Sequence, residues 1–169
     1  MKRKFIKKPG AQKRRRKDDD GEFTISGLKK DCWDLFSRFI RTRDCQKTTG
    51  TFWHGTCVTC DKDYPIGKLQ AGHFIQGRSN AVLFDEEHVH GQCQGCNMFK
   101  GGMPLEYMDF MVQTFGLERV QAMRDESKRV VHFTREDLEG ILGSLAFKLE
   151  ALNPGDDLLA KMKKRHGLQ

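Results

Sequence analysis

Two Cys-x-x-Cys motifs carry the strongest chemical signal in the sequence: Cys57 with Cys60, and Cys93 with Cys96. Two such pairs, separated along one chain, are typical of a tetrahedral zinc site with four thiolate ligands. A site of this kind has no open coordination position, so we expect the zinc to be structural and not catalytic. It would close the loop formed by residues 61–92 and stabilise the fold, because metal binding and folding are linked.

The six cysteines could instead form three disulfides, as in a small secreted protein. The paired spacing of four of them, and the lack of an apolar segment after the basic start of the chain, favour the zinc site. Cys32 and Cys45 have no paired spacing. We expect both to be small buried residues of the core.

A histidine and an asparagine lie where a shared zinc ion would bring them together. His73 is midway along the zinc-closed loop, in the segment QAGHF, and Asn97 directly follows Cys96. A neutral imidazole can take a proton from water near pH 7, and a carboxamide oxygen can bind Mg²⁺ or Mn²⁺. The pair therefore suits phosphodiester hydrolysis, in which a divalent cation offsets charge on the phosphorus and on the leaving oxygen.

Two basic residues near this pair are candidate phosphate contacts. Lys100 lies three residues after Asn97, about one helical turn, and Arg78 follows the strand that carries His73. Simpler interpretations stay open for all four residues. His73 could be a buried structural histidine, Asn97 could cap the short helix, and the two cations could be solvated surface charges.

The charge of the chain is concentrated at its start. The formal net charge is +7, and residues 1–20 hold ten Lys/Arg and three Asp, which leaves the other 149 residues with 20 basic and 20 acidic side chains. We expect residues 1–27 to be a disordered tail that binds DNA phosphates, and a solubilising or targeting tail is the alternative. The predicted contacts are Lys13, Arg14, Arg15, Arg16 and Lys17.

No apolar run approaches the roughly 20 residues that a membrane span needs. The basic start has no following apolar region of the kind found in secretion signals. We therefore expect a soluble, intracellular protein without a membrane partner.

Apolar periodicity predicts an α+β domain over residues 28–152, followed by a solvated tail over 153–169. Two short apolar runs in residues 68–92 indicate a strand pair, or a strand with an extended loop. Thr134 to Asp137 resembles a capping box. The expected helices cover 28–43, 94–100, 104–115, the segment from 117 to 123, and 134–152.

The expected inner faces of the two middle helices follow from the same periodicity. The first contains Leu105, Met108, Met111, Val112 and Phe115, and the second contains Leu117, Val120 and Met123.

The combined motif CVTC…AGHF…HVHGQCQGCNMFKGG resembles the HNH, or ββα-metal, nucleases that have a four-cysteine zinc site. More narrowly it is similar to the NinG/Rap recombination endonucleases of lambdoid phages, and more distantly to recombination endonuclease VII. The likeness runs from about Leu28 to Leu152. It implies a zinc-stapled ββα-metal core between an N-terminal helix and C-terminal helices, in a phage protein of the host cytoplasm.

The resemblance also implies an activity. Such enzymes are metal-dependent and structure-specific, and they cut branched DNA such as Holliday junctions and D-loops to leave 5′-phosphate and 3′-hydroxyl ends. It assigns His73 as general base and Asn97 as a ligand of the catalytic metal. Because resolving a junction takes two nicks, we expect a homodimer, with phage recombination proteins as further partners.

The chain departs from the HNH pattern at three positions. Gly72 stands where many HNH enzymes have an acidic ligand before the base, although NinG proteins also have glycine there. Gln70 replaces an aspartate that NinG proteins often carry, and His88 replaces the middle asparagine. A catalytic role is therefore open for His88 and for His90, and the further metal ligands nearest in sequence are Asp85, Glu86 and His90.

Two other functions fit these residues. One is a non-catalytic zinc module that binds DNA or assembles a phage complex, which the missing acidic ligand favours. The other is an HNH nuclease of homing or packaging type that cuts at a sequence. The chain offers no separate recognition module beyond its tail and helical end, which favours recognition of DNA structure.

Overall fold

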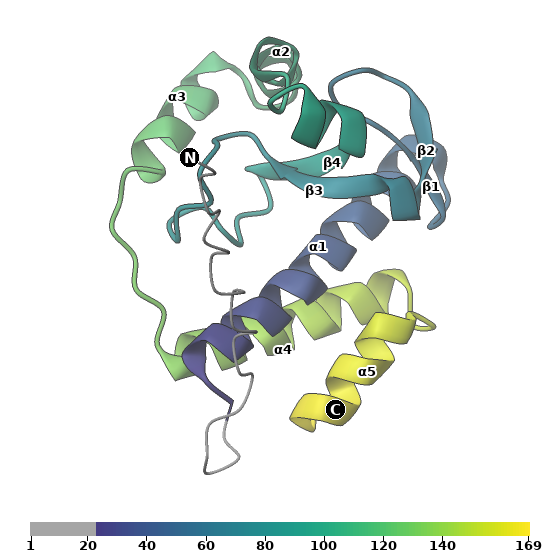
Figure 1. The fold of residues 1–169 in the computed structure, drawn as a ribbon, viewed down its shortest axis with the longest axis vertical. Helices are drawn as coiled ribbons and strands as arrows, with labels where there is room; N and C mark the ends of the chain where they lie inside the picture. The colour runs from purple at the N-terminus through teal and green to yellow at the C-terminus, as the bar shows by residue number, and fades with distance from the viewer. Residues whose placement is uncertain (1–22) are drawn as a thin grey trace, which may run out of the picture.

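The computed structural model of the chain describes residues 23–169, and Figure 1 shows the arrangement of its elements. The basic tail and its five predicted DNA contacts lie outside these residues. In chain order the elements are α1 (Ile25–Thr49), β1 (His54–Thr56), β2 (Asp63–Pro65), η1 (Ile66–Lys68), β3 (Leu69–His73), β4 (Val89–Cys93), η2 (Gly95–Phe99), α2 (Pro104–Phe115), α3 (Leu117–Glu126), α4 (Arg135–Leu152) and α5 (Asp157–His166).

Helix α1 runs through the middle of the molecule and separates two groups of elements (Figure 1). It starts at Thr24, whose hydroxyl accepts a hydrogen bond from the Gly27 amide, and it ends at Gly50, whose φ of 70° suits glycine. The helix is longer than the expected 28–43. Periodicity predicts one apolar face on this helix, of which Cys32, Phe36, Phe39 and Ile40 are buried and Trp33 is half-buried.

One side of α1 packs on α4 and α5 and forms the largest apolar cluster. Helix α4 opens with the predicted capping box, in which Thr134 and Asp137 each bond the other's backbone amide. Helix α5 differs from the expected solvated tail, because Leu159 and Met162 are buried in this cluster. Arg165 and His166 also reach the buried carboxylate of Asp31 on α1, each at 3.0 Å.

The other side of α1 carries the sheets. Strands β3 and β4 pair antiparallel, and Gly72 lies opposite His90 while His73 lies opposite Val89. Strands β1 and β2 form a second antiparallel pair. The strand pair expected within 68–92 is therefore confirmed. The short helix expected after Cys93 is also present as η2, with π-helical hydrogen bonding.

Helices α2 and α3 cover the face of β4 that turns away from α1. Pro104 begins α2 as predicted, but the expected inner faces were partly wrong. Leu105 is 77% exposed and Leu117 is 53% exposed, whereas Tyr107 is fully buried. Tyr107 takes the inner position because its hydroxyl reaches the strands, as described below.

The mixture of helices with two small sheets confirms the α+β class. The assignment to a ββα-metal core stays a prediction at this point. Across residues 23–169, none of the helices is long and apolar enough to span a bilayer.

Candidate functional site

The four predicted zinc ligands meet at one point in the structure. The sulfur atoms of Cys57, Cys60, Cys93 and Cys96 all lie within 4.8 Å of one another. A tetrahedral zinc–thiolate site with bonds of about 2.3 Å places its sulfurs about 3.8 Å apart, so this group of thiols could hold a zinc ion. Cys45, by contrast, is buried beside the cluster and is not part of it.

Backbone amides prepare two of the sulfurs to carry negative charge. The amide of Cys93 donates to Cys57 Sγ at 3.2 Å, and the amide of Cys96 donates to Cys93 Sγ at 3.4 Å. Burial by itself raises the pKa of Cys93, but the Cys96 amide and neighbouring side chains lower it to about 7. The thiolate is the ligand form, so this shift favours Cys93 as a metal ligand, while burial raises the pKa of the neighbouring Cys60 and Cys96 thiols.

Strand β3 ends at His73, which enters a cavity of about 230 Å³ that Asn97 also lines. The Nε2 atom of His73 lies 3.3 Å from the carbonyl oxygen of Leu83. A carbonyl oxygen can only accept, so Nε2 carries the proton and Nδ1 is left as an acceptor. Among the described residues no group donates to Nδ1, which is the arrangement that a general base requires.

Trp33 on α1 fixes the orientation of this imidazole. The two rings stack with their centroids 5.2 Å apart and 16° between their planes. The guanidinium carbon of Arg78 lies 4.4 Å from the centroid of the same indole. The indole of Trp33 therefore contacts both His73, the candidate base, and Arg78, a candidate phosphate contact.

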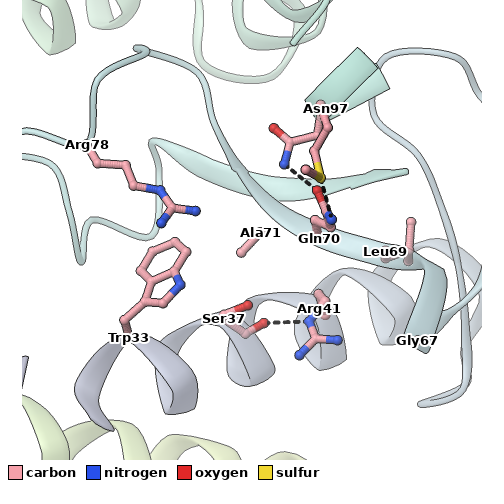
Figure 2. Close-up of a pocket in the computed structure, with 10 residues that line it drawn as sticks. Trp33, Ser37, Arg41, Gly67, Leu69, Gln70, Ala71, Arg78 and Asn97 are labelled. Carbon is pink, nitrogen blue, oxygen red and sulfur yellow. Dashed lines mark hydrogen bonds between the residues drawn. The ribbon is translucent and has the colours of Figure 1, made fainter. Parts of the chain in front are cut away.

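Asn97 is oriented by Gln70 on β3. The side-chain nitrogen of Asn97 donates to Gln70 Oε1 at 2.7 Å, and Gln70 Nε2 lies 3.3 Å from the sulfur of Met98. Figure 2 shows that the carboxamide oxygen of Asn97 then points away from Gln70. An amide oxygen that is turned outward in this way is a suitable ligand for a hard cation.

The glycine that replaces the usual acidic residue has a steric cause. A Cβ atom at Gly72 would lie 2.1 Å from Oε1 of Gln92, which is buried beside it. Gln92 is held there because its Nε2 donates to the carbonyl of Gly102 at 2.9 Å and to Thr59 Oγ1 at 3.2 Å. No side chain fits at position 72 unless Gln92 changes.

A buried ion pair joins α1 to the backbone of β4. Asp44 Oδ2 accepts from the amide of Gly91 at 2.7 Å, and Asp44 Oδ1 pairs with Arg43 Nε at 2.7 Å. Arg43 also donates to the carbonyls of Glu86 and Val89, both at 2.9 Å. These bonds set the position of β4, and through its pairing with β3 they set the position of His73.

His88 and Asp85 support the loop and do not line the cavity. The imidazole of His88 is fully buried, and its Nε2 lies 3.3 Å from the carbonyl of Met123. Its Nδ1 is 3.2 Å from Asp85 Oδ1, although outside hydrogen-bond geometry. The backbone carbonyl of His88 accepts from the Phe74 amide at 2.8 Å, so His88 is connected to His73 through the backbone and not through its side chain. Catalytic roles for these two side chains are not supported.

The side chain of His90 lies on the opposite face of the strand pair from that of His73. Its Nδ1 is 3.2 Å from the hydroxyl of Tyr107, which donates to the carbonyl of Gly72 at 2.8 Å. The imidazole packs edge-on against Phe110, with 4.8 Å between ring centroids. His90 lines neither of the cavities that contain Asn97, so its contacts favour a packing role over the predicted catalytic or metal-binding role. In the sequence His90 is a lone histidine three residues before Cys93, and this position does not distinguish a metal-binding role from a packing role.

The burial of two histidines makes the stability of the fold sensitive to acid. Burial lowers the pKa of His90 and of His73 to about 4. Between pH 6.5 and 4 the unfolded chain binds more protons, so the free energy of unfolding falls as the pH is lowered through this range. For His90 the loss between pH 7 and pH 5 should be on the order of 2 kcal/mol, and above pH 7 it should vanish.

Urea unfolding of the wild type and of His90→Gln at pH 7 and pH 5 measures this loss. Glutamine can still bond Tyr107 but does not titrate, so the variant should lose about 2 kcal/mol less than the wild type between the two pH values. Protonation of the cysteines affects both proteins alike. An equal loss in the two proteins would contradict the prediction.

Lys100 is exposed at the end of η2, and the described residues offer its side chain no ion-pair partner. Sequence reasoning missed Trp33 as a site residue, because its spacing on α1 is that of a core residue. It also missed Arg41, which lines the neighbouring cavity with Trp33, Gln70 and Asn97. A signal was available, since Trp33 and Arg41 lie two four-residue steps apart on α1.

Comparison with known proteins identifies one family. The family model described as "Bacteriophage Lambda NinG protein" matches residues 1–154, and thus all of the described chain as far as Pro154. Comparisons with curated proteins and with solved structures found no match. Helix α5 lies beyond the matched segment. The match spans most of the chain, and the chain belongs to the family of the bacteriophage lambda NinG protein.

Proposed function

We propose that the chain is a metal-dependent endonuclease that cuts branched recombination intermediates, such as Holliday junctions and D-loops. Membership of the NinG family suggests a function related to phage recombination. The observation that carries the proposal is the shared cavity of His73 and Asn97, which have an acceptor nitrogen and an outward carboxamide oxygen. A phosphate bound in this cavity would have both side chains among its neighbours.

In this proposal His73 Nδ1 takes a proton from the water that attacks the scissile phosphate. Because the pKa of His73 is lowered to about 4 by burial, the imidazole is unprotonated at neutral pH and ready to accept. The phosphate brings negative charge beside the ring, which raises the pKa again as the proton is transferred. Cleavage on the far side of the phosphorus leaves a 5′-phosphate and a 3′-hydroxyl.

Asn97 is the residue that would hold Mg²⁺ or Mn²⁺, through its carboxamide oxygen. Such a cation, when bound, offsets the charge of the phosphate and of the leaving oxygen. Gln70 serves this role indirectly, because it occupies the amide nitrogen of Asn97 and so keeps the oxygen outward. No carboxylate lines the cavity among the described residues, so waters and phosphate oxygens would supply the other ligands.

The order β3, β4 and η2 supports a ββα-metal core, because the candidate base ends the first strand and the candidate ligand lies on the helix that follows the second. The four thiols would hold a structural Zn²⁺ that fixes the start of this helix. A homodimer would place two such sites across a four-way junction, as two nicks require.

Cleavage of a labelled four-way junction tests the proposal directly. The junction should be cut when Mg²⁺ or Mn²⁺ is added and should stay intact when both are omitted, and a linear duplex of the same sequence should be cut far more slowly. Equal cleavage of the two DNAs would indicate a sequence-directed nuclease. Binding of the junction without any cleavage would indicate a non-catalytic module, which the lack of a carboxylate in the cavity favours.

A further inference from the structure

A larger cavity, of about 450 Å³, opens beside the candidate site and shares Asn97 and Arg78 with it. Figure 2 shows its two walls. Helix α1 forms one wall with Trp33, Ser37 and Arg41. Strand β3, η2 and the loop that carries Arg78 form the other. We call this space the α1 cleft.

The α1 cleft carries positive charge without a compensating carboxylate. Neither aspartate nor glutamate occurs among its lining residues, which include two arginines. Elsewhere in the described chain, four arginines are paired with acidic side chains. These pairs are Arg38–Asp156, Arg43–Asp44, Arg119–Glu87 and Arg165–Asp31. Arg41 and Arg78, the two arginines of the cleft, take part in none of these ion pairs.

Within residues 23–169, main-chain carbonyls alone align Arg41. Its Nε donates to the carbonyl of Ser37 at 3.0 Å, and one terminal nitrogen donates to the carbonyl of Ile66 at 3.3 Å. The side chain is half-buried, and its pKa is lowered from the ordinary value because burial and then the charge of Arg38 outweigh the opposing effects of Cys45 and Asp156. Asp156 is already paired with Arg38, so the partly buried guanidinium of Arg41 has no ion pair of its own among the described residues, and an anion that arrives from outside would stabilise it.

The cleft continues along α1 toward the start of the helix. Lys29 lines an adjoining cavity of about 390 Å³, which shares Trp33 and Arg78 with the α1 cleft. Lys29, Trp33, Ser37 and Arg41 follow one another at four-residue steps. At 1.5 Å per residue the stripe spans about 18 Å, or roughly five nucleotide rises of 3.4 Å. His73 stacks on its second member, so the candidate scissile position lies beside the stripe.

We propose that the α1 cleft binds the phosphodiester backbone of a DNA strand, and that Arg41 contacts a phosphate next to the one that is cut. A guanidinium can bind two phosphate oxygens at once, and its fixed contacts to Ser37 and Ile66 keep the remaining N–H groups directed at one place. This assignment rests on the proposed function for the position of the scissile phosphate, but the phosphate contact itself can be measured without cleavage.

The test is the affinity of the full-length protein for a four-way junction, measured by fluorescence anisotropy with Mg²⁺ omitted. Arg41→Gln should raise Kd about tenfold, the usual effect of losing a hydrogen bond to a charged group. It should also reduce the slope of log Kd against log salt by about one. Arg41→Lys keeps the charge and should retain the slope while it loses part of the affinity.

Arg129→Gln is the matched control, since Arg129 is exposed and also bonds a main-chain carbonyl, but lines none of these cavities. Its Kd should stay within twofold of the wild type. A scan of neutral methylphosphonates along one strand should find a position that weakens the wild type about tenfold and leaves Arg41→Gln nearly unchanged. If Arg41→Gln does not fold, Ser37→Glu puts a carboxylate into the cleft and should weaken binding at least as much.

Equal affinity and equal salt slope for the wild type and folded Arg41→Gln overturn the phosphate contact, even if the junction is cut. A methylphosphonate scan without any position that depends on Arg41 does the same. Conversely, Arg41→Gln could show the expected loss of affinity although the wild type cuts no DNA. In that case the phosphate contact in the α1 cleft stands, and only the proposed nuclease activity is overturned.

Discussion

His73→Ala should cut a four-way junction more slowly than the wild type by a factor of about 10²–10⁴, the usual contribution of a general base. The reason is geometric. Nε2 of His73 is occupied by the carbonyl of Leu83, which leaves Nδ1 as the acceptor, and the residue lines the same cavity as Asn97. Single-turnover rates with Mg²⁺ in excess measure the effect on the chemical step.

A structural role for His73 would give a different pattern. The imidazole stacks on Trp33, so its loss could also disturb α1, and thermal unfolding must show that the variant is folded. Added imidazole should restore part of the rate of His73→Ala if the missing group is a base. His132→Ala, at an exposed histidine outside the cavities, is the matched control and should cut at the wild-type rate. A folded His73→Ala at full rate would remove the mechanism.

Cys93→Ser should lose its zinc and fail to fold. Structural zinc sites contribute on the order of 10 kcal/mol or more, which is as large as the whole stability of a typical domain. Cys93 also stands at the end of β4, and its sulfur accepts from the Cys96 amide. Zinc content of the purified protein, together with circular dichroism before and after chelation, measures the loss.

Cys45→Ala is the control for this experiment. Cys45 is fully buried against the cluster but contributes no ligand, so its loss leaves a small cavity that costs about 1–2 kcal/mol. The variant should retain one zinc per chain and unfold at a lower temperature. Zinc retained at full occupancy in Cys93→Ser would show that the four thiols do not form the metal site.

Local patterns in the sequence predicted much of what surrounds the site. The capping box at Thr134, the proline at the start of α2 and the strand pair all depend on neighbours in the chain, and each is confirmed. The meeting of the four cysteines was also predictable, because zinc ligands have a characteristic spacing. The cavity shared by His73 and Asn97 follows from that closure.

Contacts between distant segments could not be predicted in the same way. The role of Trp33 depends on a ring 40 positions later, and periodicity alone identifies it as a core residue. His90 and His73 both stand in the zinc-closed loop, but the register of β3 with β4 sends them to different faces. Helix α5 is polar enough to suggest a tail, and its distant contacts, among them those of Arg165 and His166 with the buried Asp31 of α1, explain why its end is held.

The contact between Gly72 and Gln92 limits how this candidate site can evolve. An acidic residue before His73 would collide with the buried carboxamide, so that substitution requires Gln92 to give up its present conformation or to be replaced by a smaller residue. Gln92 in turn anchors Gly102, so shrinking it first loosens the turn that follows η2. The two positions are therefore epistatic, and the lineage is expected to keep glycine and glutamine as a pair or to exchange both.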